Sequence, residues 1–270
     1  MNYTNLHTHS TFSDGKYTVE ELARLALEKG MPAIGISDHS FTEFDRRYCM
    51  KPGRIGAYLQ EIRRVQVEYK DRIEVYAGLE WDGYSQLPER DEFDYLIGSC
   101  HYVRAADGSY HSVDHARDEH WDAINQHFGG DPITYARTYF ETYEALTRAH
   151  RPDILGHFDL VTKFGAVGPE DPAYRKMSAE ALEACLQVTP VVELNTKPIV
   201  RAWKDEPFPG PFLLKQALDF GGKVILSSDF HGPEQLAGWF DEGTELLKEL
   251  GFRSMVVMRG GKLEEIGIES

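Results

Sequence analysis

Two histidines near the start of the chain, His7 and His9, offer nitrogen ligands one residue apart. They follow the short run Asn5-Leu6, and on an extended chain side chains two residues apart point in the same direction. Both imidazoles could therefore bind one cation. A neutral histidine is equally at home as a hydrogen-bonded core or surface residue, so the pair alone does not establish a metal site.

The same pattern recurs further along the chain, where short apolar runs end in a polar or metal-binding side chain. Runs rich in branched residues are typical of strands that are buried on both faces. Because the carboxyl ends of parallel strands meet at one rim, we expect the closing residues to share one pocket. These residues are His39, Glu80, His101, His157, Asn195, Asp229 and His231.

Helical segments must alternate with these strands in order to position them. Thr18-Val19-Glu20-Glu21 has the spacing of a capping box and predicts a helix that ends at Gly30. Seven strand–helix units in succession favour a seven-unit α/β barrel, with an open doubly wound sheet as the alternative. Further helices are expected over about 55–69, from Asp131-Pro132 to about 149, from near Ser178, over about 211–220 and over about 241–250, with a last strand over about 255–258.

Composition indicates an ordinary globular protein in one domain, residues 1–270, with 41% hydrophobic and 27% charged residues. A net charge of -15 argues against nucleic-acid binding, which needs clustered Lys and Arg. Cys49, Cys100 and Cys185 form no Cys-x-x-Cys pair, so neither a disulfide framework nor a thiolate zinc site is expected. With no membrane-length apolar stretch, no secretory leader at Met1 and no evident protein partner, we expect a cytoplasmic protein.

Two segments stand outside the strand–helix rhythm. The polar loop through Arg46, Arg47 and Pro52 is long enough to form one wall of a site. Residues 102–125 show the least regular pattern. Four histidines lie in or near this second segment and end no strand, so we interpret them as loop or helix-surface residues: His111, His115, His120 and His127.

The motifs together resemble the polymerase and histidinol phosphatase (PHP) superfamily over almost the whole chain. More narrowly, the segments 154–160, 193–196 and 206–252 are similar to PHP-type histidinol-phosphate phosphatases. The motifs that carry the wider resemblance are His7-Thr8-His9, Ser37-Asp38-His39, Gly78-Leu79-Glu80, Gly98-Ser99-Cys100-His101, Gly156-His157 and Ser228-Asp229-Phe230-His231.

The resemblance implies a distorted (β/α)7 TIM-like barrel that holds three divalent metal ions, for which mixed imidazole and carboxylate ligands suit zinc, manganese or iron. Asp14 departs from the pattern, because many histidinol-phosphate phosphatases have a histidine at this position. The implied ligands are His7, His9, Glu80 and Asp229 for the first ion, Glu80 as a bridge with His101 and His157 for the second, and Asp14, His39 and His231 for the third.

The expected reaction is hydrolysis of L-histidinol phosphate in histidine biosynthesis, by in-line attack of a metal-bridging hydroxide. Glu80, Asp229 and His231 are the predicted catalytic residues. Three divalent ions against three carboxylates leave about three net positive charges, enough to attract a phosphate into an acidic protein. The sequence contains no phosphate-loop cysteine and no paired-aspartate motif, so we expect no phospho-enzyme.

Substrate contacts are expected from charged residues just beyond the strand ends. Lys163, Lys197 and Arg201 suit phosphate oxygens. Asp159, together with Asp82 and Glu43, could meet the substrate amine, protonate the leaving alcohol or orient a metal-bound histidine. Three alternatives remain open: a PHP phosphoesterase acting on a nucleotide or phosphotyrosine, a metal-dependent C–N hydrolase, and a metal-binding barrel without turnover.

Overall fold

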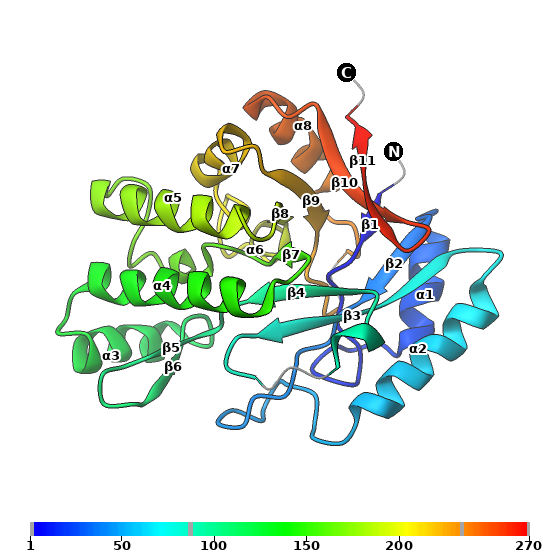
Figure 1. Cartoon of the computed structure of the whole chain (residues 1–270), viewed down its shortest axis with the longest axis horizontal. Coiled ribbons are helices and arrows are strands. Elements are labelled where there is room, and N and C mark those ends of the chain that lie inside the picture. Colours follow the sequence, from blue (N-terminus) through cyan, green and yellow to red (C-terminus); the bar gives the residue numbers. More distant parts are fainter. Residues whose placement is uncertain (1–2, 86–88, 233–234, 269–270) are drawn as a thin grey trace.

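A curled sheet forms the centre of the computed structural model, which describes residues 3–85, 89–232 and 235–268. Its strands follow one another in chain order, and each of the first seven pairs in parallel with the next (Figure 1). These seven strands are β1 (Thr4–Asn5), β2 (Ala33–Ile36), β3 (Glu74–Asp82), β4 (Tyr95–Ser99), β7 (Ile154–Leu155), β8 (Val191–Asn195) and β9 (Lys223–Ser227).

The sheet closes on itself beyond the ends of β1 and β9. Thr8 and Phe230 form a parallel bridge, in which the Phe230 N–H donates to the His7 carbonyl at 3.0 Å and the His9 N–H donates to the Phe230 carbonyl at 2.8 Å. Sequential order with closure confirms the distorted barrel and excludes the doubly wound alternative, whose strand order reverses at a switch point. Two strands extend the sheet past β9: β10 (Ser254–Arg259), and β11 (Lys262–Gly267), an antiparallel strand that the sequence did not predict.

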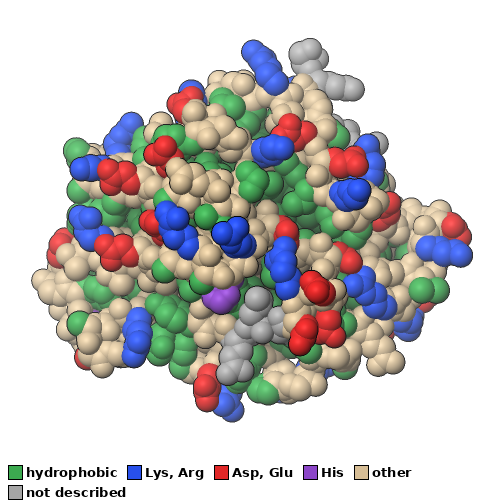
Figure 2. Space-filling model, viewed as in Figure 1, with side chains coloured by type: hydrophobic (Ala, Val, Ile, Leu, Met, Phe, Trp, Pro, Cys, Tyr) green, Lys and Arg blue, Asp and Glu red, His purple; other side chains and the backbone are tan. Residues whose placement is uncertain are grey.

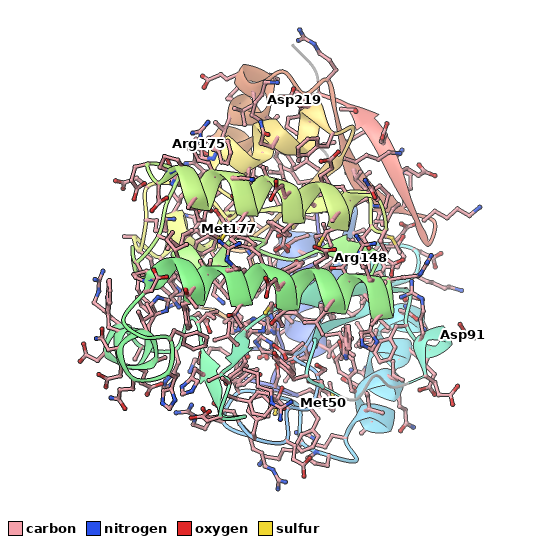
Figure 3. The ribbon with its side chains drawn as sticks, turned by 60° about the vertical axis from the view of Figure 1, so that its left-hand side comes forward. Met50, Asp91, Arg148, Arg175, Met177 and Asp219 are labelled. Carbon is pink, nitrogen blue, oxygen red and sulfur yellow. The ribbon has the colours of Figure 1, made fainter. Side chains whose placement is uncertain are left out.

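Helices cover the outside of the sheet (Figure 1). In Figure 3, α4 and α5 run side by side across the molecule, and Met177 of α5 lies between them. The helices are α1 (Val19–Glu28), α2 (Ile55–Tyr69), α3 (Arg117–His127), α4 (Pro132–His150), α5 (Pro172–Leu186), α6 (Lys197–Val200), α7 (Pro211–Asp219) and α8 (Phe240–Leu250), with short 3-10 turns η1 (Arg90–Glu92) and η2 (Leu160–Thr162).

Capping side chains set the helix starts. Thr18 and Glu21 form the predicted capping box at α1, and Asp131 accepts hydrogen bonds from two backbone N–H groups at the start of α4. The predicted start near Ser178 was wrong, because α5 begins at Pro172. Asp171 caps this helix through the N–H groups of residues 173 and 174, which is the same Asp-Pro signal that marks α4.

Small residues make room for one large side chain inside the barrel. The Tyr95 hydroxyl donates a hydrogen bond to the Leu6 carbonyl, and the ring is buried. A Cβ atom added at Gly35 would lie 2.0 Å from the Tyr95 oxygen, and one added at Gly78 would lie 2.2 Å from its ring. Glycine at both positions therefore lets Tyr95 fill the barrel interior below the strand ends that carry the polar side chains.

The segment after β4 is ordered, although its sequence pattern predicted irregular structure. It forms a hairpin of β5 (Tyr102–Arg104) and β6 (Tyr110–Ser112), followed by α3.

Basic and acidic side chains are interspersed on the face of the molecule that Figure 2 shows. Among the described residues, no helix combines the length and apolar character needed to cross a bilayer.

Candidate metal centre

Glu80 lies at the centre of a group of buried histidines at one end of the barrel. It sits inside β3, two residues before the strand ends, and is 1% exposed. Its Oε1 is 2.8 Å from His157 Nε2 and 3.4 Å from His101 Nε2, and its Oε2 is 2.7 Å from His39 Nδ1. One carboxylate therefore contacts imidazoles that come from three other strand ends.

His7 and His9 complete the same group, as the alternation of side chains predicts. The Nε2 atoms of His7 and His9 lie 3.3 Å and 3.5 Å from Glu80 Oε2. The same two nitrogens lie 3.6 Å and 3.3 Å from Asp229 Oδ1. Two carboxylates from β3 and from the end of β9 thus face one pair of imidazoles.

Asp14 lies on the outer side of this group. Its Oδ1 is 3.2 Å from His231 Nε2, 3.7 Å from His39 Nε2 and 3.9 Å from His9 Nδ1. The Asp14 side chain is 32% exposed, whereas the side chains of these three histidines are nearly buried. The structure therefore brings together all nine residues that the resemblance implied as metal ligands.

The donor set has the character of a metal site. Among the described residues, four sets of at least three ligand atoms lie within 4.8 Å of one another: His9, Asp14, His39 and His231; His7, His9 and Asp229; His7, Glu80 and His157; His39, Glu80 and His101. Buried polar atoms normally have a hydrogen-bond partner. Several ligand atoms here have none, which fits a site that holds a cation. These atoms include His7 Nε2 and both ring nitrogens of His9.

Two of the nine residues have a backbone conformation that non-glycine residues rarely adopt. His157 has φ of 21° and Asp229 has φ of 48°. Each lies two residues after the end of a strand, in the turn that follows it. Strain of this kind persists where the surrounding structure fixes it, and it is concentrated at functional sites.

The charges in the group also shift each other's protonation. Burial opposes the charged form of His101, but Glu80 and Asp82 outweigh burial and raise its pKa to about 9. Burial opposes ionisation of Glu80 too, yet the imidazoles around it, led by His39, hold its pKa well below the usual range. Burial dominates at His9 and lowers its pKa. The site therefore keeps its carboxylates ionised, as metal ligands require.

A second layer of carboxylates orients these imidazoles. The His7 Nδ1–H group donates to Glu193 Oε1 at 2.6 Å, and the backbone N–H of His157 donates to Glu193 Oε2 at 2.8 Å. The Asp82 carboxylate accepts from the backbone N–H and the Nδ1 of His101 at 3.0 and 3.1 Å. We did not identify Glu193 from the sequence, although a charged residue within the apolar run 191–194 was a signal that it serves a buried partner.

Asp38 holds the loop that carries Asp14. Its Oδ1 accepts hydrogen bonds from the backbone N–H groups of Ser10 and Ser13, each at 2.9 Å, and Oδ2 accepts from the Ser10 hydroxyl at 2.7 Å. Burial raises the pKa of Asp38, and these hydrogen bonds act in the opposite direction. Asp38 thus fixes the turn between His9 and Asp14, a role that its place in the Ser37-Asp38-His39 motif did not reveal.

A cavity of about 340 Å³ opens onto the cluster. Of the residues predicted to bind phosphate, Lys197 lines this cavity, and its Nζ donates to Asp229 Oδ1 at 2.9 Å. Several wall residues were not predicted individually, although the loop at 46–52 was expected to form a wall. The cavity is lined by Asp14, His39, Asp45, Arg47, Tyr48, His101, Tyr102, Ser112, Asp114, His115, His157, Leu160, Lys197, Trp203, Phe208, Asp229 and His231.

The other predicted substrate residues lie outside this lining. Lys163 contacts the lining residue Trp203, with Nζ 4.1 Å from the centre of its ring, and Arg201 is exposed at the end of α6. Asp159 is buried and accepts a hydrogen bond from the Gly210 N–H at 3.1 Å. Glu43 is exposed.

The four histidines in or near residues 102–125 belong to none of the four candidate ligand sets among the described residues. His111 and His127 pack ring to ring at 4.1 Å between centres, and His115 lines the cavity. The interpretation of His120 as a loop or helix-surface residue was wrong, because it is fully buried, with Nδ1 3.0 Å from the Val113 carbonyl.

The chain belongs to the PHP domain family, whose model matches residues 5–197. The chain is 30% identical over 265 residues to a Deinococcus radiodurans protein named "Probable histidinol-phosphatase", with 92% of each chain covered. It is 25% identical over 287 residues to the histidinol-phosphatase of Lactococcus lactis subsp. lactis, covering 98% of this chain and 97% of the relative.

Solved structures show the same fold. HisK from Listeria monocytogenes superposes with a TM-score of 0.75 at 19% identity, covering 88% of this chain and 99% of that one. Histidinol phosphate phosphatase from Lactococcus lactis, crystallised with zinc, L-histidinol and phosphate, gives a TM-score of 0.67 at 21% identity, covering 97% and 99%.

Proposed function

We propose that this chain, as one PHP-type barrel over residues 1–270, is a metal-dependent phosphomonoesterase that hydrolyses L-histidinol phosphate to L-histidinol and phosphate. The observation that carries the proposal is the Glu80-centred set of buried, unpaired imidazole nitrogens beside a cavity lined by Lys197. The names of the two curated relatives support the substrate. Histidine biosynthesis and a cytoplasmic location follow from the proposed reaction as predictions.

Three divalent ions, of zinc, manganese or iron, would occupy the site. Glu80 would bridge two of them, because both its oxygens face imidazoles. Ions in such a centre neutralise phosphate charge and make water a nucleophile near neutral pH. The full ligand sets would be His7, His9, Glu80 and Asp229; Glu80, His101 and His157; and Asp14, His39 and His231.

The remaining chemistry belongs to the chain's own side chains. Lys197 lies 2.9 Å from Asp229 Oδ1 and 3.1 Å from His231 Nδ1, which places its ammonium group where it can bind a phosphate oxygen at the edge of the centre. Lys163 and Arg201 lie over the ring of Trp203, which lines the cavity, and add positive charge next to this wall residue. Asp159 supports this wall through Gly210, so we assign it a positioning role.

Glu80, Asp229 and His231 are the residues we assign to catalysis. Glu80 and Asp229 fix the charge and geometry of the cluster, because each faces both His7 and His9. His231 lies at the open side, 11% exposed, with Nε2 toward Asp14. With Asp14 it would therefore hold the third ion on the side of the cluster that faces the cavity.

The test is phosphate release after chelation and re-addition of zinc, manganese or iron, one metal at a time. We expect L-histidinol phosphate to be cleaved only by metal-loaded protein and with a kcat/KM at least tenfold above those for phosphotyrosine and a nucleoside monophosphate. Comparable rates on all three esters would replace the proposed substrate. Metal-loaded protein that is inert on every phosphate would contradict phosphatase activity and revive the C–N hydrolase and non-catalytic alternatives.

A further inference from the structure

Two carboxylates line the cavity outside the metal cluster, Asp45 and Asp114. Asp45 already has a full set of partners. Arg47 donates to its oxygens from Nε at 2.9 Å and from Nη2 at 2.5 Å, and the Tyr102 hydroxyl donates at 2.7 Å. The charge of Asp45 is therefore neutralised within the wall.

Asp114 differs from Asp45, because its carboxylate keeps acceptor positions toward the cavity. The Ser112 hydroxyl donates to Oδ1 at 3.2 Å. Lys163 Nζ lies 3.6 Å from Oδ2, beyond a direct hydrogen bond, and donates instead to the backbone carbonyl of Asp114 at 2.7 Å. An ionised carboxylate offers about four acceptor positions, and the side chain of Asp114 is 31% exposed.

The three acidic residues that the sequence suggested for a substrate amine have other positions. Asp82 accepts from His101, Asp159 accepts from the Gly210 N–H, and Glu43 is exposed outside the cavity lining. Within the described lining, Asp114 is thus the carboxylate that neither belongs to the metal cluster nor forms a short ion pair.

Aromatic residues line the same cavity as Asp114. Tyr48 and Tyr102 are two of them, whereas the Trp203 ring already has Lys163 Nζ 4.1 Å from its centre. Aromatic faces attract ammonium groups, and the attraction grows where water is excluded. The predicted metal ligands therefore form one side of the cavity, where a phosphate could bind. Asp114 is a carboxylate on the same lining that could bind a positive charge.

We propose that Asp114 binds the ammonium group of the substrate and so selects phosphate esters of amino alcohols over phosphate esters of alcohols that have no amino group. This inference rests on the proposed function, because it assigns the second end of the same substrate. In L-histidinol phosphate, the amino group is attached to the carbon adjacent to the one that bears the phosphate ester. Asp114 and the cluster lie within one cavity, so a single molecule can reach both.

The experiment compares L-histidinol phosphate with the imidazolylpropyl phosphate that lacks only the amino group. With wild-type, metal-loaded protein we expect the amine to raise kcat/KM. Asp114→Asn should lower kcat/KM for L-histidinol phosphate roughly 10- to 100-fold, mainly through KM, and leave the deaminated ester within about twofold, because a charged hydrogen bond is lost only with the amine. Asp114→Glu should recover part of the preference.

Asp118→Asn is the matched control, because Asp118 is exposed on α3 and lies outside the cavity lining. It should change neither rate. Equal losses on both esters in Asp114→Asn would overturn the inference, since Asp114 would then act through Lys163 on the phosphate. Unchanged rates on both would overturn it too.

Calorimetric binding of L-histidinol, compared with its deaminated analogue, separates this inference from the proposed function. Weaker binding of L-histidinol alone to Asp114→Asn supports the ammonium site even where turnover of the phosphate ester fails. Absent or equal binding of the two alcohols in wild type and variant contradicts the ammonium site, whatever the turnover.

Discussion

The Nδ1–H group of His7 donates to Glu193 Oε1 at 2.6 Å, and both side chains are buried. This contact fixes the orientation of the His7 ring, so that Nε2 faces Glu80 and Asp229. The second Glu193 oxygen binds the His157 backbone N–H. One carboxylate behind the site therefore positions two of the predicted metal ligands.

Glu193→Gln should weaken metal binding roughly 10- to 100-fold, as loss of a carboxylate behind a histidine ligand does in other metal sites. The amide cannot supply the negative charge that makes His7 a better ligand. Competition with a chromophoric chelator measures the affinity directly. Glu183→Gln on the exposed face of α5 is the control; a variant at Glu193 that binds metal as tightly as this control would remove Glu193 from the account.

Glu80→Gln should reduce phosphate release more than roughly 100-fold and lower the metal content, because Glu80 faces all five inner imidazoles and would bridge two ions. Metal analysis and a phosphate-release assay provide the two readings. The exposed Glu141→Gln on α4 should match wild type.

His120→Ala should keep full metal content but lower stability, since His120 packs in the core. Similar metal loss in the Glu80 and His120 variants would break the ligand assignment.

The metal-free protein should become less stable as pH rises from about 6.5 to 9. Glu80 and Asp82 outweigh burial and raise the pKa of His101 to about 9, so the folded state binds this proton more tightly than the unfolded chain. The resulting stability is complete below pH 6.5 and disappears as pH rises through 9, a change on the order of 2 to 3 kcal/mol. Urea unfolding in excess chelator measures it, and a rise in stability across this range would contradict the prediction.

Gly78→Ala should lower the free energy of unfolding by roughly 1–3 kcal/mol, because the added Cβ would lie 2.2 Å from the buried Tyr95 ring. Gly56→Ala is an informative counterpart. Gly56 lies in α2 with nothing within 4 Å of an added Cβ, so this change should stabilise the protein by up to about 1 kcal/mol. Denaturant unfolding of both variants checks the signs, and equal effects would show that the barrel interior is not tightly packed at Tyr95.

Local sequence signals predicted the features that short segments determine. The Thr18 and Asp131 caps placed their helices, and polar residues after apolar runs identified the side chains that converge at the barrel end. The hairpin β5–β6 was not predicted, because the segment that forms it has an irregular sequence pattern. The wall residues Asp45 and Asp114 were not predicted, because their roles depend on segments that are distant in sequence and meet only in the folded cavity. Glu193 lies within β8, and its role was missed because its partner His7 is distant in sequence.

Anomalous diffraction at the zinc edge, from crystals of zinc-reconstituted protein, tests the central claim most directly. We expect three zinc peaks among the nine predicted ligands, each at about 2.0–2.2 Å from imidazole nitrogens and carboxylate oxygens. Glu80 should bridge two of the three ions. Peaks placed elsewhere, or none between Glu80 and the surrounding histidines, would contradict it.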